Sequence, residues 1–460
     1  MMCDGQKHRV VSIADKSRSL FGIYRIVEHM ESVYRVLLVG GGGREHAIAT
    51  ALNSDERCEV LACASNRNPG IAEIAAAYGE CGERSPDDIV TFAQTHDADM
   101  AIIGPESALE AGVADALTAS GIFTFGPQAA SARIETDKAF QREFMQTESI
   151  PGCPSFAVFE NTDAACEYIE SSSTDLAVKP AGLTGGKGVK IIGDQVTPAE
   201  AKSYLRSHDY EQIVLEERLR GEEFTVQAFV ANGELRATPA IQDHKRAFEG
   251  DTGPNTGGMG SYSTASNILP FMTEPEYAQA VDILEATVSA LASYTGILYG
   301  QFMLTANGPK VIEFNARFGD PEAMNTLPVM KTSLLDIMRA AEANEELPEL
   351  EFDQQATVCK YGVPKGYPTD PESGVEIPID TAHDDTATVF YASVDEQEGD
   401  ILTTTSRSLA IVGTGDTITQ AEGDVENALS TFDGTLRVRH DIGTEEAIQQ
   451  RITHMRNLRS

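Results

Sequence analysis

One stretch of this chain is too rich in glycine for an ordinary helix or strand. Residues 251–263 spell DTGPNTGGMGSYS and place four glycines around Pro254 and Asn255. Each glycine costs backbone entropy when it is ordered, so this density favours a loop. Residues 241–246, IQDHKR, bring charged side chains beside it. The sequence therefore predicts backbone that lies close to a charged ligand, and a cluster of surface turns is the simpler alternative.

The length and the charge of the chain restrict its fold and its partners. A chain of 460 residues needs several domains, and no apolar run approaches the roughly 20 residues of a membrane helix. Residues 1–29 contain no continuous apolar segment, so they do not resemble a secretory signal. The net charge of −36 is expected to repel nucleic acid and anionic membranes, and molar salt would screen it. We therefore predict a cytoplasmic, halophilic protein, a monomer or weak homo-oligomer, whose partners are small molecules rather than nucleic acid or membranes.

The cysteines favour free thiols. The seven residues form no CxxC pair and are odd in number; they stand at positions 3, 58, 63, 81, 153, 166 and 359. Zinc sites and disulfide frameworks usually show paired spacings. We therefore expect buried thiols rather than a zinc site or a set of disulfides.

Strands and helices alternate in the first part of the chain. Apolar runs at residues 34–39, 59–64 and 99–103 predict buried strands, and a glycine turn at 40–43 leads into a helix at 45–52. Such alternation is typical of a parallel α/β domain. Further along we predict a helix at 273–293, and strands at residues 175–180, 189–192, 213–217, 224–230, 311–315, 388–392 and 408–412.

These patterns predict an α/β (α+β) architecture of several domains. Residues 1–29 form an extension that is either disordered or a misassigned start, because Met30 just precedes the first strand. The expected domains are a Rossmann-like domain at 30–133, a central domain at 134–354 with a lid at about 155–222, and a small β-rich domain at 355–460.

The first glycine turn, GGGGREH, has the form of a phosphate cradle. A strand-to-helix turn presents backbone N–H groups and a helix N-terminus to an anion. A dinucleotide fingerprint needs a third glycine, where Glu45 or His46 stands, and an acidic residue at the end of the second strand, which is missing. NAD binding is therefore disfavoured, and a packed turn without a ligand stays an alternative. The favoured ligand is a phosphorylated small molecule held by Gly42, Gly43 and Arg44.

Residues 181–189, AGLTGGKGV, form a second glycine loop between two predicted strands. The GxxxxGK[ST] pattern and a following helix are both missing, so this is not a P-loop. Its amides and Lys187 could close over a triphosphate, while Lys138 and Lys179 could bind phosphate oxygens. A lone lysine is usually a solvated surface group, but Lys179 lies in the apolar run LAVKP.

Residues 311–322, VIEFNARFGDPE, predict a metal-binding strand. Side chains two apart share a face, so Glu313 and Asn315 point together while Ile312 and Phe314 point into a core. Carboxylate and amide oxygens suit Mg²⁺ or Mn²⁺, which share their shell with nucleotide phosphates. A hydrated strand face is the alternative, and the charged turn that follows makes it less favoured.

In this order the pieces resemble the ATP-grasp ligases. The strings GGREH, GPE, QDHKR, DTGPNTGGMG, RFGDPE and RHDIG are similar to those of the phosphoribosylamine–glycine ligase family over residues 34–445. The resemblance implies an ATP-grasp fold with a Rossmann-like N-terminal domain and a small β-rich C-terminal domain. It also implies a C–N ligase of purine biosynthesis, in which ATP drives the joining of glycine to 5-phosphoribosylamine through glycyl phosphate.

The same resemblance implies the site residues. Adenine is expected at Glu216 and the backbone to Leu219, and the ribose hydroxyls at Glu223. The ATP-binding set is Lys138, Lys179, Gly185, Gly186, Lys187, Gly188, Glu216, Leu219 and Glu223. The substrate-binding set is Gly42, Gly43, Arg44, Asp243, Asn255 and Arg317. The catalytic set is Lys179, Asp243, Lys245 and Arg317, and the metal ligands are Glu313 and Asn315.

Four places depart from the family pattern. Gly41 replaces an asparagine, His440 replaces an arginine, Thr184-Gly185 varies the lid, and Gln301 stands opposite the metal pair where the family usually has a small residue. No charged catalytic group is lost by these changes. The alternatives are another ATP-grasp carboxylate–amine ligase, such as a carboxylase subunit, a non-catalytic nucleotide-binding module and, third, an oxidoreductase. The DTGPNTGGMG string disfavours the first, and the retained charged residues disfavour the second.

Overall fold

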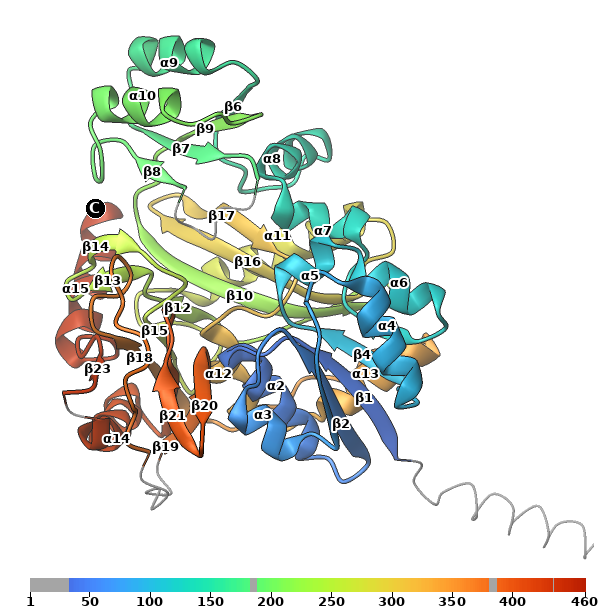
Figure 1. Ribbon diagram of the computed structural model, residues 1–460. Helices are drawn as coiled ribbons and strands as arrows, with labels where there is room; N and C mark the ends of the chain where they lie inside the picture. Colours follow the sequence, from blue (N-terminus) through green and yellow to red (C-terminus); the bar gives the residue numbers. More distant parts are fainter. Residues whose placement is uncertain (1–32, 183–187, 380–386, 433) are drawn as a thin grey trace, which may run out of the picture.

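The structure is a computed structural model that describes residues 33–182, 188–379, 387–432 and 434–460 (Figure 1). Five sheets organise these residues: a parallel sheet of five strands, a sheet of four, a sheet of ten and two hairpin ribbons. In Figure 1 the four-stranded sheet stands above the long strands of the ten-stranded sheet, and the parallel sheet lies below them. The site described below lies where these layers meet.

The N-terminal parallel sheet has the strand order β3-β2-β1-β4-β5. Its strands are β1 (Tyr34–Val39), β2 (Cys58–Ala64), β3 (Ala77–Glu80), β4 (Met100–Ile103) and β5 (Phe123–Phe125). Its helices are α2 (Gly43–Asn53), α3 (Pro69–Ile74), α4 (Pro86–Thr95), α5 (Glu106–Glu110) and α6 (Val113–Ala119). The chain order reverses between β1 and β4, and ligands of open α/β sheets bind at the carboxyl ends of the strands at such a point. The glycine turn after β1 lies there.

The four-stranded sheet has the order β6-β9-β7-β8, and all its pairs are antiparallel. Its strands are β6 (Phe156–Phe159), β7 (Leu176–Pro180), β8 (Lys190–Ile191) and β9 (Ile213–Glu217). Helices α9 (Thr162–Ser171) and α10 (Pro198–Arg206) pack on it and close a small core of their own.

The ten-stranded sheet runs through the rest of the chain in the order β17-β16-β10-β12-β15-β18-β22-β19, with β11 beside β10 and β23 beside β18. Its first six strands in chain order are β10 (Glu222–Ala231), β11 (Glu234–Ala237), β12 (Ile241–Asp243), β15 (Gly260–Ser263), β16 (Gly296–Thr305) and β17 (Gly308–Asn315). The others are β18 (Ala356–Pro364), β19 (Ala387–Tyr391), β22 (Leu409–Gly415) and β23 (Leu436–Arg437). Strands after residue 355 therefore continue the sheet of the central region, and the division into domains stays a prediction.

The remaining elements surround this sheet. The ribbons pair β13 (Arg246–Phe248) with β14 (Thr252–Asn255), and β20 (Val394–Gln397) with β21 (Asp400–Thr403). The helices are α7 (Ala129–Thr136), α8 (Lys138–Thr147), α11 (Glu274–Ala290), α12 (Glu322–Thr326), α13 (Leu334–Ala343), α14 (Ile418–Leu429) and α15 (Glu445–Leu458), with 3-10 turns at Leu327–Val329 and Ser430–Phe432. No helix of the described residues is long and apolar enough to span a bilayer.

The predicted strands and the helix α11 are confirmed within a few residues, but the glycine-rich stretch is not simply a loop. It contains β14 and the sheet strand β15. Gly260 explains why a strand can be so rich in glycine. A Cβ at this position would lie 2.3 Å from the carbonyl oxygen of Cys359 on β18, so the close pairing of β15 and β18 requires glycine.

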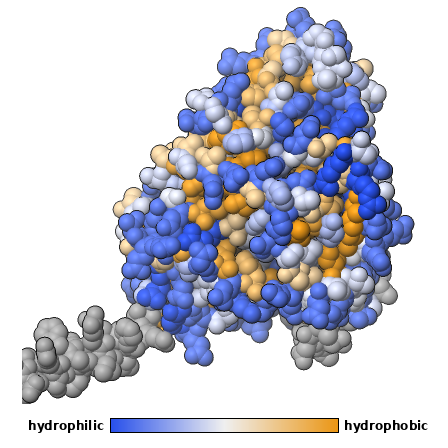
Figure 2. Space-filling model, turned by 180° about the vertical axis from the view of Figure 1, so that it is seen from behind, coloured by the Kyte–Doolittle hydropathy of each residue, from blue (hydrophilic) through white to orange (hydrophobic). Residues whose placement is uncertain are grey.

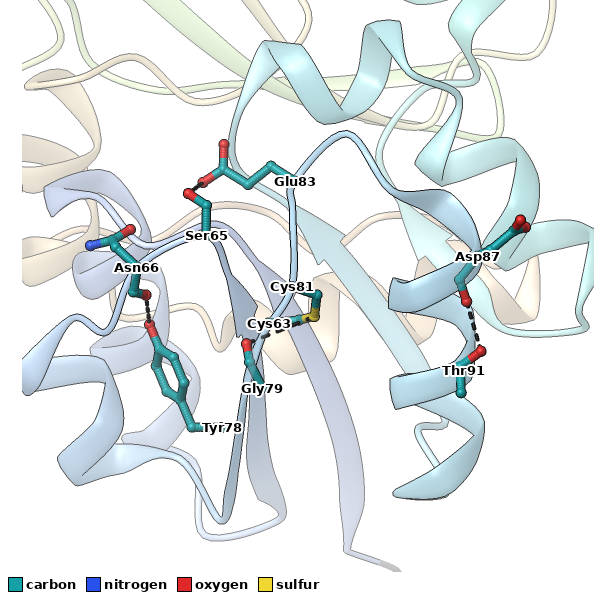
Figure 3. The surroundings of a disulfide bond; sticks show 9 residues. All are labelled: Cys63, Ser65, Asn66, Tyr78, Gly79, Cys81, Glu83, Asp87 and Thr91. Atoms are coloured by element: carbon teal, nitrogen blue, oxygen red, sulfur yellow. Dashed lines mark hydrogen bonds between the residues drawn. A yellow bond between two sulfur atoms is a disulfide. The ribbon is translucent and has the colours of Figure 1, made fainter.

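The expectation that the cysteines are free is wrong for one pair. Cys63 and Cys81 form a disulfide, with Cα atoms 5.9 Å apart (Figure 3). Cys63 lies in β2 and Cys81 directly follows β3, so the pairing of two parallel strands brings together residues that are far apart in sequence. Cys166 and Cys359 are buried free thiols, Cys58 and Cys153 are half-buried, and Cys3 is outside the described residues.

Polar residues cover most of the rim of the molecule seen from behind, and apolar residues show between them (Figure 2). Among the described residues, the exposed large hydrophobic side chains are Val33, Tyr168, Phe248 and Val375. They lie on different elements, so they form no common apolar face.

Candidate active site

A cleft of about 670 Å³ joins all the main parts of the chain. Helices α2 and α5 of the parallel sheet contribute Arg44 and Glu106 to it, α7 contributes Glu135, and the four-stranded sheet contributes Lys179 and Glu216. The long strands β10, β16 and β17 contribute Glu223, Gln301, Glu313 and Asn315. Asp243, Lys245 and Asn255 arrive from the glycine-rich region, and Arg407 and Arg451 from the C-terminal part. Of the sequence-predicted residues that the structure describes, all but Gly42, Gly43 and Gly188 line this one cavity.

Lys179 lies in β7, where the four-stranded sheet lines the cleft, and it forms a buried ion pair. Its Nζ is 2.8 Å from Glu216 Oε2 and donates to the carbonyl oxygen of Ile312 at 3.0 Å. Arg142 binds the same carboxylate, with Nε 2.7 Å from Glu216 Oε1. Burial alone would raise the pKa of Glu216, but Arg142 and Lys179 lower it. The carboxylate is therefore charged and holds Lys179 near the end of β7.

Two further parts of the predicted phosphate site lie near Lys179. Lys138 begins α8 and donates from Nζ to the carbonyl oxygen of Gly182 at 2.9 Å. The carbonyl oxygen of Gly188 accepts a hydrogen bond from Tyr204 Oη at 3.0 Å. Lys138 and Gly188 therefore both lie beside the second glycine loop. Its predicted ligands Gly185, Gly186 and Lys187 lie outside the described residues.

The face of β17 differs from simple alternation. Glu313 pairs with Gln301 of β16, but the next pair is Phe302 with Val311, so Ile312 is an extra residue in a bulge. Ile312 is half-buried and lines the cleft, whereas Val311 and Phe314 are in the core. The prediction that Ile312 points into the core is wrong because a bulge breaks the period of two. Glu313 and Asn315 both line the cleft, as the pattern indicated.

Lys245 stands opposite Glu313. Its Nζ is 3.4 Å from Glu313 Oε1 and also donates to Gln301 Oε1. Burial would raise the pKa of Glu313, but Lys245, Lys138 and Lys179 lower it to about 2. Glu313 is therefore an ionised, half-buried carboxylate that lines the cleft.

Asp243 carries an unusual buried carboxylate. Its Oδ1 is enclosed and finds no hydrogen-bond partner among the described residues. Burial and the neighbouring Glu322 raise the pKa of Asp243 well above its ordinary value, against the effect of Lys245. A buried acceptor without a partner is costly, so this oxygen is suited to a positive or hydrogen-bonding ligand. Asn255 lies at the edge of the cleft, where its Oδ1 accepts from Gln195 Nε2 at 3.4 Å.

The first glycine turn is held by the residue that follows Arg44. The Glu45 carboxylate accepts the N–H of Gly42 at 2.8 Å and Arg44 Nε at 2.7 Å. Gly104, directly after the neighbouring strand β4, leaves room for this side chain, since a Cβ there would lie 2.0 Å from Glu45 Oε1. Gly43 begins α2 directly after the turn. Arg44 is thus fixed at the carboxyl edge of the parallel sheet.

Arg317 joins this edge to strand β17. Its Nη2 is 2.8 Å from Glu135 Oε1 and donates to Asn315 Oδ1 at 3.3 Å, and its Nε is 3.5 Å from Glu106 Oε2. Burial raises the pKa of Glu135, whereas Arg317 and Arg44 outweigh burial at Glu106 and lower its pKa to about 2. A chain of alternating charges therefore links the glycine turn to Asn315.

The sequence predictions missed several charged residues of the site. Glu135, Arg407 and Arg451 line the cleft, and Arg142 is buried behind it, paired with Glu216. Arg407 donates to the carbonyl oxygens of Gly257 and Gly258, each at 2.9 Å, and pairs with Asp320 Oδ2 at 2.9 Å. It lies between β21 and β22 with no surrounding motif, so only the long-range pairing of β15, β18 and β22 brings it to the cleft. Glu106 was not predicted as a site residue either, although it belongs to the GPE string and could have been found from that motif.

The central part of the chain defines its class. Residues 136–323 match the model of the phosphoribosylglycinamide synthetase ATP-grasp (A) domain. The chain therefore has the ATP-grasp fold. A crystal structure of biotin carboxylase from Campylobacter jejuni shares this overall arrangement, with a TM-score of 0.73 at 12% identity over 93% of this chain and 99% of that one.

The flanking parts narrow the class to a family. Residues 34–135 match the N domain and residues 357–445 the C domain of phosphoribosylglycinamide synthetase. The chain belongs to this family. It is 49% identical over 433 residues to the phosphoribosylamine–glycine ligase of Methanococcoides burtonii, covering 92% of this chain and 99% of the relative. A crystal structure of the Thermotoga maritima phosphoribosylamine–glycine ligase matches it with a TM-score of 0.75 and 27% identity over 89% of this chain and all of that one.

Proposed function

We infer that this chain is a phosphoribosylamine–glycine ligase that joins glycine to 5-phosphoribosylamine at the expense of ATP. The observation that carries the inference is a single cleft to which all three family domains contribute charged residues. Its product is glycinamide ribonucleotide, released with ADP and phosphate. The oxidoreductase and non-catalytic alternatives leave this arrangement unexplained.

The nucleotide is assigned to the part of the cleft that is lined by the four-stranded sheet and the start of β10. Glu216 is engaged with Arg142 and Lys179, so the adenine contacts are assigned to the backbone from Glu217 to Leu219 rather than to the Glu216 carboxylate. Glu223 would bind the ribose hydroxyls. Lys138, Lys179 and the loop from Gly185 to Gly188 would bind the phosphates, since ammonium groups and amides both favour anions.

Glu313 and Asn315 fit a Mg²⁺ or Mn²⁺ ion that accompanies the nucleotide. No cluster of three or more metal-ligating side chains occurs in the described part of the chain, so the protein offers no complete cage. It offers one ionised carboxylate and one amide oxygen, which is the small oxygen set that Mg²⁺ uses when phosphates supply other ligands. When bound, the ion would neutralise the charge that builds up on the transferring phosphoryl group.

The first step is proposed to occur between the long strands and the glycine-rich region. A carboxylate oxygen of glycine attacks the γ-phosphorus of ATP, the bond to the β,γ-bridging oxygen breaks, and ADP leaves as glycyl phosphate forms. Lys179, Lys245 and Arg317 reduce the repulsion between the two anions. Asp243, with its unsatisfied oxygen, is assigned to the ammonium group of glycine.

The second step is proposed to occur at the edge of the parallel sheet. Gly42, Gly43 and Arg44 would bind the phosphate of phosphoribosylamine, whose amine attacks the acyl carbon of glycyl phosphate. The bond from that carbon to the phosphate oxygen breaks, phosphate leaves, and the new amide nitrogen loses a proton. Asn255 and Arg317 line the path between the two halves of the cleft. Closing the cleft would exclude the water that hydrolyses an acyl phosphate.

Several wider features are part of the same proposal. The enzyme is proposed to be cytoplasmic, to act as a monomer or weak homo-oligomer, and to bind neither nucleic acid nor membranes. The net charge of −36 supports adaptation to high salt. Division at residues 133 and 354 into N-terminal, ATP-grasp and C-terminal domains follows the same proposal.

An omission assay tests this function. Purified protein is incubated with ATP, Mg²⁺, glycine and freshly generated phosphoribosylamine, and glycinamide ribonucleotide is measured by mass spectrometry alongside phosphate release. Product is expected only when all four are present, and Lys179→Met serves as the inactive control. Phosphate release that is unaffected by leaving out glycine or phosphoribosylamine would contradict the assignment.

A further inference from the structure

Gln301 occupies a position that links the nucleotide half of the cleft to the reaction centre. It lies in β16, between β10 and β17, and its side chain is buried with 2% exposure. It is directly opposite Glu313 on β17 and opposite Thr225 on β10, which places it diagonally from Glu223. Directly opposite and diagonal residues of neighbouring strands share one face and contact each other. One neutral amide therefore stands between two carboxylates of the cleft.

Both ends of this amide are used. Gln301 Nε2 donates to Glu223 Oε2 at 2.9 Å, and Gln301 Oε1 accepts a hydrogen bond from Lys245 Nζ. Lys245 in turn is paired with Glu313 at 3.4 Å. A buried amide with both groups bonded has a fixed orientation, because turning it over would place its N–H₂ against an ammonium and its oxygen against a carboxylate.

Glu223 depends on this contact. Its carboxylate has no other hydrogen-bond or ion-pair partner among the described residues. The neighbouring Glu222 is different, because Arg451 and His454 hold its carboxylate at 2.9 and 2.5 Å. Glu223 is thus held at one oxygen, while the rest of its carboxylate faces the cleft and can accept from a ligand.

We propose that Gln301 is a positioning residue that aims Glu223 at the ribose hydroxyls of ATP and holds Lys245 beside the transferring phosphate. The proposal rests on the proposed function for the identity of the nucleotide, and it explains why an amide stands at this position. A carboxylate could accept from Lys245 but could not donate to Glu223. A small residue would hold neither neighbour.

The test compares the use of ATP with that of 2′-deoxyATP and 3′-deoxyATP. For each nucleotide, kcat and KM are measured in wild type, Gln301→Met, Gln301→Glu, Glu223→Gln and the Gln301→Met/Glu223→Gln double variant. Gln227→Met is the matched control, because Gln227 is equally buried on β10 but bonds to Thr326 and Gly319 instead. It reports the effect of deleting a buried amide as such.

Wild type is expected to prefer ATP over at least one deoxynucleotide. Both Gln301 variants should reduce that preference by about tenfold, the range of one hydrogen bond to a charged group, and Gln301→Met should also lower kcat at saturating ATP. The double variant should show the same preference as Glu223→Gln alone. Gln227→Met should leave the preference unchanged whatever it does to the melting temperature.

Three results would overturn the proposal. One is unchanged nucleotide preference in both Gln301 variants, and another is a double variant in which the two losses add. The third is a wild type or Glu223→Gln enzyme whose preference does not depend on the ribose hydroxyls. If the wild type forms no glycinamide ribonucleotide, the proposed function fails, and calorimetric affinities for ADP and 2′-deoxyADP with Mg²⁺ still decide the role of Gln301.

Discussion

The two halves of the cleft differ in how their charges are paired. At the edge of the parallel sheet, the cations Arg44 and Arg317 already have carboxylate partners in Glu45, Glu106 and Glu135. Along the long strands the excess is of carboxylates. Within the described part of the chain, Asp243 has an oxygen without a partner, the Glu223 carboxylate has one hydrogen bond, and Glu313 shares Lys245 with Gln301.

This difference indicates that one half of the cleft is preformed for an anionic ligand, whereas the other half needs bound cations. The paired half is built before substrate arrives, and its arginines keep a fixed geometry for an anionic phosphate. The carboxylate-rich half is incomplete without cations. In the proposed function those cations are a divalent metal and the ammonium group of glycine, so binding should relieve a repulsion that the free protein carries.

The largest expected effect on ligation comes from removing the charge of Glu313, the proposed metal ligand in the carboxylate-rich half. Glu313→Gln should lower the rate of ligation by about a thousandfold, since a single preorganised charge at a reacting group is worth this order. Glu349→Gln is the control, because this exposed carboxylate pairs with Arg236 far from the cleft. Steady-state rates at saturating Mg²⁺ measure the effect, and near-normal turnover of Glu313→Gln would remove the metal assignment.

The outer surface and the cleft should respond differently to salt. At about 0.01 M salt the Debye length is near 30 Å, and at 1 M it is near 3 Å, so the repulsion of a net charge of −36 falls steeply. We expect the melting temperature to rise by roughly 10 °C between dilute buffer and molar KCl. The buried pairs of Arg44 and Arg317 should respond little. A melting temperature independent of KCl would reject the high-salt adaptation and leave the ligase assignment intact.

A smaller effect is expected when the unsatisfied oxygen of Asp243 is replaced. The pKa of Asp243 is raised in the folded protein, so the folded state binds its proton more tightly than the unfolded state. Stability is therefore lost as pH rises above the ordinary value of about 4 towards the raised value. Asp243→Asn should raise the melting temperature by about 2 °C at pH 8 and by less at pH 5, while ligation falls. A lower melting temperature at pH 8 would show that the carboxylate stabilises the free protein.

The smallest effect is expected from the chain before Met30. The family model begins at residue 34, and the paired half of the cleft begins with the turn after β1. Protein that starts at Met30 should therefore keep the melting temperature and the KM for phosphoribosylamine of the full chain. A raised KM for this substrate alone would place the N-terminal segment at the glycine turn.

The two halves also differ in how far the sequence could predict them. Periodicity and glycine placement predicted β1, its turn and the shared orientation of Glu313 and Asn315, because these are local properties of a strand. The bulge at Ile312 and the Cys63–Cys81 disulfide depend on how neighbouring strands pair, so spacing alone could not predict them.

The charge partners were the least predictable part. Arg142 reaches Glu216 across 74 residues, and Arg407 reaches Asp320 across 87. Neither arginine lies in a motif, and an arginine on a helix or loop is usually a solvated group. Their role follows only from the two sheets that bring β7 and β9, and β15 and β22, around the cleft.

Calorimetric titration with ADP, in the presence and absence of Mg²⁺, tests the division of the cleft most directly. Wild type, Glu313→Gln and Arg44→Ala would be compared. The account predicts that Glu313→Gln loses the gain in ADP affinity that Mg²⁺ provides, whereas Arg44→Ala binds ADP as wild type does. An Arg44→Ala protein that loses ADP affinity as strongly as Glu313→Gln would contradict it.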